Sequence, residues 1–258
     1  MIVIAHVSDP HIDEGQRSRE RAAAVMRYLE TLPFDLDAVL VSGDVTDHGL
    51  AAEYVLARDV FPSRRPVILL PGNHDVRGPF RQVLLGEDPV DGPVDGPVDA
   101  PINQVHRAPG FVLAACDTSI PGRHDGRLDG GTLAWLRDVL TGTAPGTPVL
   151  IAFHHPPVEL HVPFIDAIRQ FGEQDLAALI EAHPDVVGVL CGHAHTPAVT
   201  TFAGRPLLVA PGVVSTLRLP WEHRAAPDDH VHLDLPPALA FHVLDGGRLT
   251  THFRTVTV

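Results

Sequence analysis

The chain has 258 residues, of which 45% are hydrophobic, and a formal net charge of −13 with histidine neutral. The acidic balance argues against stable binding along a nucleic-acid backbone, which requires a basic face, and no apolar run approaches the ~20 residues of a membrane span. We therefore expect a cytoplasmic protein in which residues 1–258 form one globular domain.

Apolar runs of strand length alternate with helical patterns along most of the chain. The runs cover residues 2–8, 38–42, 66–70, 111–116, 148–153, 186–191 and 206–210, and the helical patterns cover residues 18–32, 132–140 and 173–183. Continuous apolar strands separated by helices are typical of βαβ units in sheets that are covered on both faces. The fold class is therefore predicted as α/β.

The C-terminal segment, residues 236–258, has a different pattern. Two strand-like runs flank Asp245-Gly246-Gly247, and a glycine-rich pair between such runs predicts a tight hairpin. We expect these residues to add antiparallel strands to the fold.

A four-residue unit repeats three times in residues 89–101, with the sequence PVDGPVDGPVDAP. Proline at every fourth position is incompatible with a helix or a central strand, so the segment is predicted to be an extended surface loop. A calcium site built from Asp91, Asp95 and Asp99 is the weaker alternative, because their spacing matches no calcium-binding loop.

Polar clusters follow five of the predicted strands. In chain order they are Asp9-Pro10-His11, Gly43-Asp44, Gly72-Asn73-His74-Asp75, His154-His155-Pro156-Pro157 and Gly192-His193-Ala194-His195. Each cluster alone also fits an ordinary turn or helix cap. Ligands bind beyond the carboxyl ends of strands in open α/β sheets, however, so five such clusters are expected to converge.

The residue types in these clusters suit a metal centre. Histidine nitrogens together with carboxylate and amide oxygens, without thiolates, are typical ligands of zinc, manganese or iron. The candidate ligands are Asp9, His11, Asp44, Asn73, His154, His193 and His195. A single ion with an open position needs only three or four protein ligands. The larger set indicates two ions that share a carboxylate, an arrangement that stabilises both the attacking and the leaving oxygen of phosphoryl displacement.

The series Asp-x-His, Gly-Asp, Gly-Asn-His-Asp, His-His-Pro and Gly-His-x-His, in this order over residues 9–195, resembles the motifs of the calcineurin-like metallophosphoesterases. The resemblance implies a four-layer α/β/β/α sandwich with two mixed sheets and a dinuclear centre of Fe, Mn or Zn at the strand ends. It implies that one ion is held by Asp9, His11, Asp44 and His195, and the other by Asp44, Asn73, His154 and His193. A hydroxide bridging the two ions would then attack the phosphorus atom.

The resemblance also implies roles for residues beside the ligands. His74 is similar to the family histidine that contacts the substrate phosphate or protonates the leaving oxygen, and Asp75 is expected to orient its imidazole. His155 lies either behind the ligands or next to the substrate. His161 and Asp166 follow a ligand-bearing strand, and they either line the substrate side or belong to an ordinary surface loop.

Residues 116–126 and 154–168 resemble the bacterial class III cyclic-nucleotide and glycerophosphodiester phosphodiesterase branch of this family. The resemblance implies an enzyme that hydrolyses small phosphodiesters, with 3′,5′-cyclic nucleotides as the leading substrate. A glycerophosphodiesterase, a phosphomonoesterase or a protein phosphatase on the same core stays open, and so does a homodimer. A non-enzymatic scaffold is disfavoured, because every ligand position holds a residue competent to bind metal.

Overall fold

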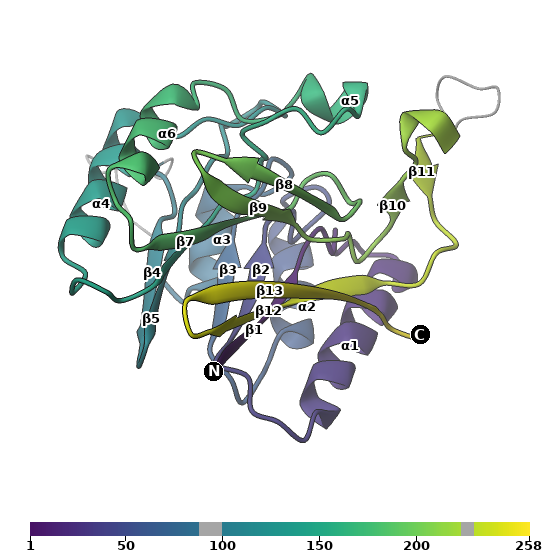
Figure 1. The fold of residues 1–258 in the computed structure, drawn as a ribbon. Helices are drawn as coiled ribbons and strands as arrows, with labels where there is room; N and C mark the ends of the chain where they lie inside the picture. Colours follow the sequence, from purple (N-terminus) through teal and green to yellow (C-terminus); the bar gives the residue numbers. More distant parts are fainter. Residues whose placement is uncertain (88–99, 223–229) are drawn as a thin grey trace.

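A computed structural model describes residues 1–87, 100–222 and 230–258. Within these residues the chain forms a five-stranded sheet, a six-stranded sheet and a two-stranded ribbon (Figure 1). Residues 89–99 of the predicted repeat loop, with Asp91, Asp95 and Asp99, lie outside the described residues. No helix within the described ranges is long and apolar enough to cross a membrane.

The first sheet joins the N-terminal strands to the C-terminal hairpin. Its strand order is β13 (Arg248–Thr255), β12 (Ala238–Asp245), β1 (Ile2–Val7), β2 (Ala38–Ser42) and β3 (Val67–Leu70). Strands β1 to β3 are parallel, whereas β12 is antiparallel to both β1 and β13. The predicted hairpin is confirmed, because Asp245 pairs with Arg248 and the two glycines between them have φ angles of 55° and 78°, as a tight primed turn requires.

The second sheet is also mixed. Its strand order is β4 (Gln104–Ala108), β5 (Phe111–Ala115), β6 (Val149–Ala152), β7 (Val186–Cys191), β9 (Arg205–Val209) and β8 (Ala198–Phe202). The four central strands are parallel, and the two edge strands β4 and β8 are antiparallel to their neighbours. Strands β10 (Thr216–Leu217) and β11 (Val231–His232) form the separate ribbon.

Three hydrophobic clusters define four layers. One joins the facing sides of the two sheets, through residues such as Leu40 and Leu150. A second packs the first sheet against α1 (Gln16–Thr31), α2 (Ala51–Val60) and α3 (Arg77–Leu84). A third packs the second sheet against α4 (Gly130–Thr141) and α6 (Gln174–Glu181), with the short α5 (Pro163–Asp166) nearby. The predicted α/β/β/α sandwich is confirmed, and Figure 1 shows α4 and α6 on the side away from α1 and α2.

Several elements were not predicted from the sequence. Helix α2 buries only Glu53, Tyr54 and Ala57, so it lacks the aliphatic stripe by which a helix is recognised. Strand β4, and β8 up to its buried last residue Phe202, alternate between exposed and half-buried positions, because each lies at an edge of its sheet. Both omissions concern elements whose burial is set by their neighbours rather than by their own hydrophobic pattern.

Candidate metal centre

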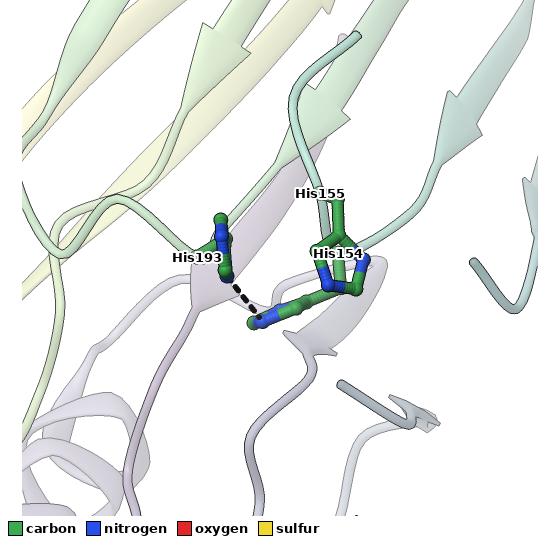
Figure 2. A group of neighbouring side chains, drawn as sticks. All are labelled: His154, His155 and His193. Carbon is green, nitrogen blue, oxygen red and sulfur yellow. Dashed lines mark hydrogen bonds between the residues drawn. The ribbon is translucent and has the colours of Figure 1, made fainter. Parts of the chain in front are cut away.

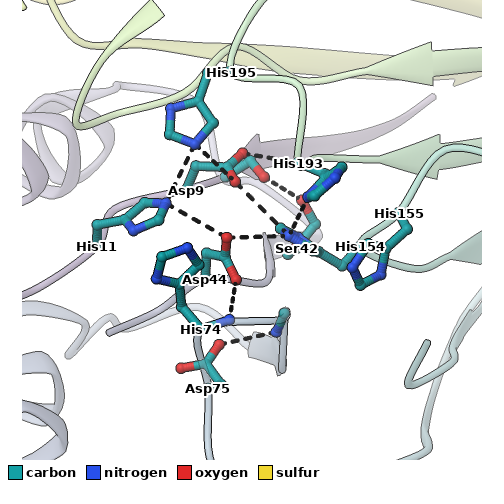
Figure 3. A network of polar contacts seen from close by, with 12 residues as sticks. Asp9, His11, Ser42, Asp44, His74, Asp75, His154, His155, His193 and His195 are labelled. Atoms are coloured by element: carbon teal, nitrogen blue, oxygen red, sulfur yellow. Dashed lines mark hydrogen bonds and ion pairs between the residues drawn. The ribbon is translucent and has the colours of Figure 1, made fainter. Parts of the chain in front are cut away.

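The five polar clusters converge where the carboxyl ends of strands from the two sheets lie side by side (Figure 3). The candidate ligands are Asp9 and His11 after β1, Asp44 after β2, Asn73 after β3, His154 after β6, and His193 and His195 after β7. Backbone hydrogen bonds tie these loops together, since Asp9 donates to the carbonyl of Gly43 and His11 to that of Asp44. The expected convergence is confirmed, and both sheets contribute to it.

One group of donor atoms gathers around the loop that follows β1. The Nε2 atom of His195 lies 3.2 Å from Nε2 of His11 and 3.5 Å from Oδ1 of Asp9. The Oδ2 atom of Asp44 is 3.5 Å from Nε2 of His11. Neighbouring ligands of an ion with bonds of about 2.0–2.1 Å lie roughly 3 Å apart. This spacing therefore fits one ion held by Asp9, His11, Asp44 and His195.

A second group lies on the other side of Asp44. The Nε2 atom of His154 is 3.3 Å from Oδ2 of Asp44 and 3.3 Å from Nδ1 of His193. Figure 2 shows the His154–His193 contact, with His155 beside it. Asn73 lines the same cavity as Asp44 and His193. The same oxygen of Asp44 thus faces both groups, as a bridging carboxylate would.

Two buried oxygens in the centre have no hydrogen-bond partner. They are Oδ1 of Asp9 and Oδ1 of Asn73. Burying a polar atom without a partner costs about 1–3 kcal/mol, so each needs a compensating ligand. The other oxygen of Asp9 accepts the backbone N–H of His193 at 3.1 Å. The donor set and these two atoms fit the binding of cations.

Each of three candidate histidines is held through its Nδ1 atom. The contacts are His11 to Oδ1 of Asp47 at 2.8 Å, His154 to the carbonyl of Ser42 at 2.7 Å, and His195 to Oγ of Ser215 at 2.8 Å. A proton on Nδ1 leaves Nε2 with a free lone pair that faces the centre. These three partners were not predicted from the sequence, and the one available signal was the position of Asp47 three residues after Asp44.

The ligand loops have unusual backbone conformations. Left-handed φ angles occur at Asp9 (52°), His11 (43°), Asp44 (47°), His193 (67°) and His195 (53°). Such angles are uncommon outside glycine and cost about 1–3 kcal/mol each, and they cluster at functional sites. His193 and His195 therefore reach the centre through a tight bend beyond β7, and not through the alternation of an extended strand.

Glycines before the ligands allow the close approach of neighbouring loops. A Cβ atom on Gly72 would lie 2.2 Å from Oδ1 of Asp44, and one on Gly192 would lie 1.9 Å from Oγ of Ser8. Both contacts are far inside van der Waals distance. Glycine is therefore required at both positions for the strand ends to pack together.

The charges in the centre favour an ionised Asp44. Burial alone would raise the pKa of Asp44, but His154 and His11 hold it well below its usual range. Burial would likewise lower the pKa of His154, whereas the Asp44 and Asp9 carboxylates raise it to about 9. Burial and the neighbouring His155 and His154 lower the pKa of His193. Without an ion, the Asp44 carboxylate and a protonated His154 thus stabilise each other, and a bound cation would take the place of the proton on Nε2 of His154.

His74 and Asp75 do not form the pair that was expected. The Nδ1 atom of His74 contacts the backbone carbonyl of Asp47 at 2.7 Å, and its backbone N–H donates to Asp44. Asp75 is buried and accepts the backbone N–H groups of Gly72 and Val45, both at 2.9 Å. The prediction that Asp75 orients the imidazole of His74 is wrong, because its carboxylate instead joins the loops after β2 and β3.

The structure also places the other residues that were predicted to lie near the metal ligands. His155 is fully buried, with Nδ1 2.8 Å from Oγ1 of Thr118, so it lies behind the ligands and not beside the substrate. His161 and Asp166 do not line the cavity over the centre, and Asp166 accepts the backbone N–H of Leu160. His124 does line this cavity. It lies in the stretch 116–126 that resembles the phosphodiesterase branch, but no role had been predicted for it.

The family of this chain follows from a match that covers most of it. Residues 2–197 match the family described as calcineurin-like phosphoesterase, so the chain belongs to this family and is a metal-dependent phosphoric ester hydrolase. The family uses a dinuclear metal centre, in agreement with the two groups of donor atoms.

Individual relatives within the family are also similar to this chain. The chain is 31% identical over 250 residues to "Glycerophosphodiester phosphodiesterase GpdQ" of Enterobacter lignolyticus (strain SCF1), a match covering 93% of this chain and 86% of that protein. It is 32% identical over 218 residues to a "Probable cyclic nucleotide phosphodiesterase" of Rhodococcus erythropolis, covering 80% and 69% of the two chains. A dimetal phosphatase from Danio rerio shares the fold, with a TM-score of 0.69 at 16% identity, over 98% of this chain and 96% of that one.

Proposed function

We propose that this protein hydrolyses small phosphodiesters and that 3′,5′-cyclic nucleotides are its preferred substrates. The observation that carries the proposal is a cavity of about 370 Å³ over the candidate ligands, which is the size of a small-molecule site. Beside the ligands, its lining includes the apolar side chains of Phe164, Ile165, Ile168, Leu217 and Val231. A nucleoside can bury its base against such a surface, whereas a glycerol group offers little apolar area.

The charge of the cavity favours a diester over a monoester. Among the described residues that line it, none is an arginine, and the whole chain contains no lysine. A phosphomonoester carries more negative charge than a diester, and a fixed cation would stabilise it. A phosphomonoesterase or protein phosphatase is therefore less well supported. A glycerophosphodiesterase is the second candidate, because of the similarity to the protein named GpdQ.

Two sets of side chains would hold the ions in this proposal. They are Asp9, His11, Asp44 and His195 for one ion, and Asp44, Asn73, His154 and His193 for the other. Imidazole with carboxylate and amide oxygens suits Fe, Mn or Zn. When bound, such a pair of ions lowers the pKa of a water molecule and neutralises charge on the phosphoryl oxygens.

His74 is the proposed catalytic residue for the leaving group. Its Nδ1–H is held by the carbonyl of Asp47, so Nε2 is the ring nitrogen left to act in the cavity that His74 lines. With a second proton on Nε2, His74 is an imidazolium that can donate a hydrogen bond to the phosphate, or pass that proton to the departing alkoxide and return to the neutral Nδ1–H form. Asp75 acts indirectly in this proposal, by fixing the loops that carry Asp44 and Asn73.

The experiment measures bound metal and a substrate panel on the same preparations. Purified protein and Asp44→Ala are compared for metal content and for turnover of bis(4-nitrophenyl) phosphate, cyclic AMP, glycerophosphocholine and 4-nitrophenyl phosphate. We expect two ions per chain, diester turnover with cyclic AMP preferred, and loss of both metal and turnover in Asp44→Ala. A metal-free wild-type protein, or preferred turnover of the monoester, would contradict the proposal.

A further inference from the structure

A chain of polar side chains, all buried except the half-buried Thr251, continues from the metal centre into the layer between the two sheets. It runs from Thr251 through His242, His6 and Ser42 to Ser8, and we call it the histidine–serine chain. Its four contacts are 2.8 Å, 2.9 Å, 2.8 Å and 2.8 Å long in this order. His6, Ser8 and Ser42 are 0% exposed and His242 is 1% exposed.

The histidine–serine chain occupies positions where the fold otherwise places aliphatic residues. Ile4 and Leu40, two residues before His6 and Ser42 on the same strands, belong to the apolar cluster between the sheets, and alternate residues of a strand share a face. An aliphatic pair in place of two hydrogen-bonded groups can be nearly neutral for stability. The need to pack this layer therefore does not explain the two histidines.

The hydrogen bonds of the histidine–serine chain run in one direction. The hydroxyl of Ser42 donates to Ser8, so its oxygen is free to accept a hydrogen from Nε2 of His6. Nδ1 of His6 then accepts from Nε2 of His242, whose Nδ1 accepts from the hydroxyl of Thr251. Each imidazole donates once and accepts once, as a neutral histidine does. Burial lowers the pKa of both rings, that of His242 to about 3, which is consistent with this state.

The serine end of the histidine–serine chain lies next to the loops that carry the candidate ligands. The carbonyl of Ser42 accepts the Nδ1–H of His154 at 2.7 Å. Ser8 directly precedes Asp9, and a Cβ on Gly192, the residue before His193, would lie 1.9 Å from Oγ of Ser8 and 2.9 Å from Oγ of Ser42. The two serine hydroxyls thus lie in the space that the missing Cβ of Gly192 leaves open, next to ligand-bearing loops of both sheets.

We propose that His6, supported by His242, is a positioning residue of the metal centre: it fixes Ser42, whose carbonyl orients His154 toward the second ion. This inference rests on the proposed dinuclear centre. Partners behind metal ligands contribute about 10–100-fold to metal affinity. Because Ser42 contacts His154 and not His11 or His195, the ion held by His154 depends on His6 more than the other ion does.

The experiment titrates metal-free protein with Co²⁺ and follows the absorption bands and the two dissociation constants. The variants are His6→Leu, which removes the hydrogen bond to Ser42, His6→Gln, which restores an N–H donor, and Ile4→Ala as the matched core control. Ile4 lies on the same face of the same strand and is 1% exposed, without a polar side chain. Thermal unfolding of each variant reports the purely structural cost.

We expect His6→Leu to raise one Co²⁺ dissociation constant about 10–100-fold and to change the absorption of that ion, with the other constant nearly unchanged. His6→Gln should recover most of the affinity, and Ile4→Ala should lower thermal stability with both constants unchanged. If His6→Leu fails to fold, Ser42→Ala removes only the hydroxyl and should show the same selective loss.

Three outcomes would overturn the inference. Wild-type affinities in both His6→Leu and Ser42→Ala would mean that the histidine–serine chain does not act on the centre. An equal loss in Ile4→Ala would mean that any damage to this layer is sufficient. A wild-type protein that binds no Co²⁺ would remove the proposed centre itself, which distinguishes failure of the proposed function from failure of this inference alone.

Discussion

Replacing Asp75 with alanine tests whether this residue acts on the ligand loops or on His74. Its carboxylate accepts three backbone N–H groups, from Gly72, Val45 and Thr46, at 2.9–3.1 Å, together with the hydroxyls of Thr46 and Tyr54. The hydroxyls can rotate toward other acceptors, but the three backbone groups cannot. At about 1–3 kcal/mol for each unsatisfied group, Asp75→Ala loses about 3–9 kcal/mol.

A second effect opposes this loss. Burial, together with the nearby Asp44 carboxylate, raises the pKa of Asp75 from 3.8 to about 6. Keeping this carboxylate ionised at neutral pH therefore costs about 3 kcal/mol, and alanine removes that cost. We expect a net loss of roughly 3 kcal/mol for the metal-free protein, which is a large part of the usual stability of a domain.

Urea unfolding at pH 7 with a chelator present measures this loss. Tyr54→Phe is the control. It removes a hydroxyl that donates to Asp75 and accepts the N–H of Val76 at 2.7 Å, and it leaves the carboxylate its other partners. It should cost about 1–2 kcal/mol. If Asp75 served mainly to orient His74, Asp75→Ala would keep wild-type stability and lose only kcat. That result would refute the role of Asp75 as the acceptor that joins the two ligand loops.

Four other perturbations test contacts of the same centre and of the layer behind it. His74→Gln should lower kcat about 10²–10⁴-fold while the metal content stays unchanged. The decrease in kcat should be smaller for 4-nitrophenyl esters, because 4-nitrophenolate leaves without a proton. A loss of metal would instead mean that His74 is a ligand. Gly72→Ala should reduce metal content, because its Cβ would lie 2.2 Å from Oδ1 of Asp44. Gly130→Ala is the control and should not reduce it, because a Cβ there would have no atom within 4 Å. Equal metal content in the two variants would contradict the requirement for glycine at position 72. Burial lowers the pKa of His242 from 6.5 to about 3, so below pH 6.5 the unfolded chain takes up a proton that the folded protein does not. The free energy of unfolding should therefore fall by about 1.4 kcal/mol per pH unit from pH 6.5 toward pH 3. His242→Gln should flatten this part of the stability curve, and parallel curves would argue against a buried neutral ring. Removing metal with a chelator should lower the melting temperature of the wild type and hardly that of Asp44→Ala, and equal shifts would mean that the ions bind elsewhere.

The identity of the candidate ligands follows from local sequence. Each of the five clusters directly follows an apolar run, and the strand predicts the place of the cluster because parallel strands present their carboxyl ends at one edge of a sheet. The same patterning predicted the helices near residues 18–32, 132–140 and 173–183. These features depend on residues close together in the chain, so a sequence alone reveals them.

The partners of those ligands were decided by tertiary structure. Asp75 follows His74 in the chain, yet the two do not pair, because the fold brings the N–H groups of Val45 and Gly72 to the carboxylate. His6 and His242 are 236 positions apart and meet only because β12 pairs antiparallel with β1. Local sequence thus specifies which side chains can bind metal, whereas packing of the strands specifies what holds them, since hydrogen-bond partners depend on distance in space and not on distance along the chain.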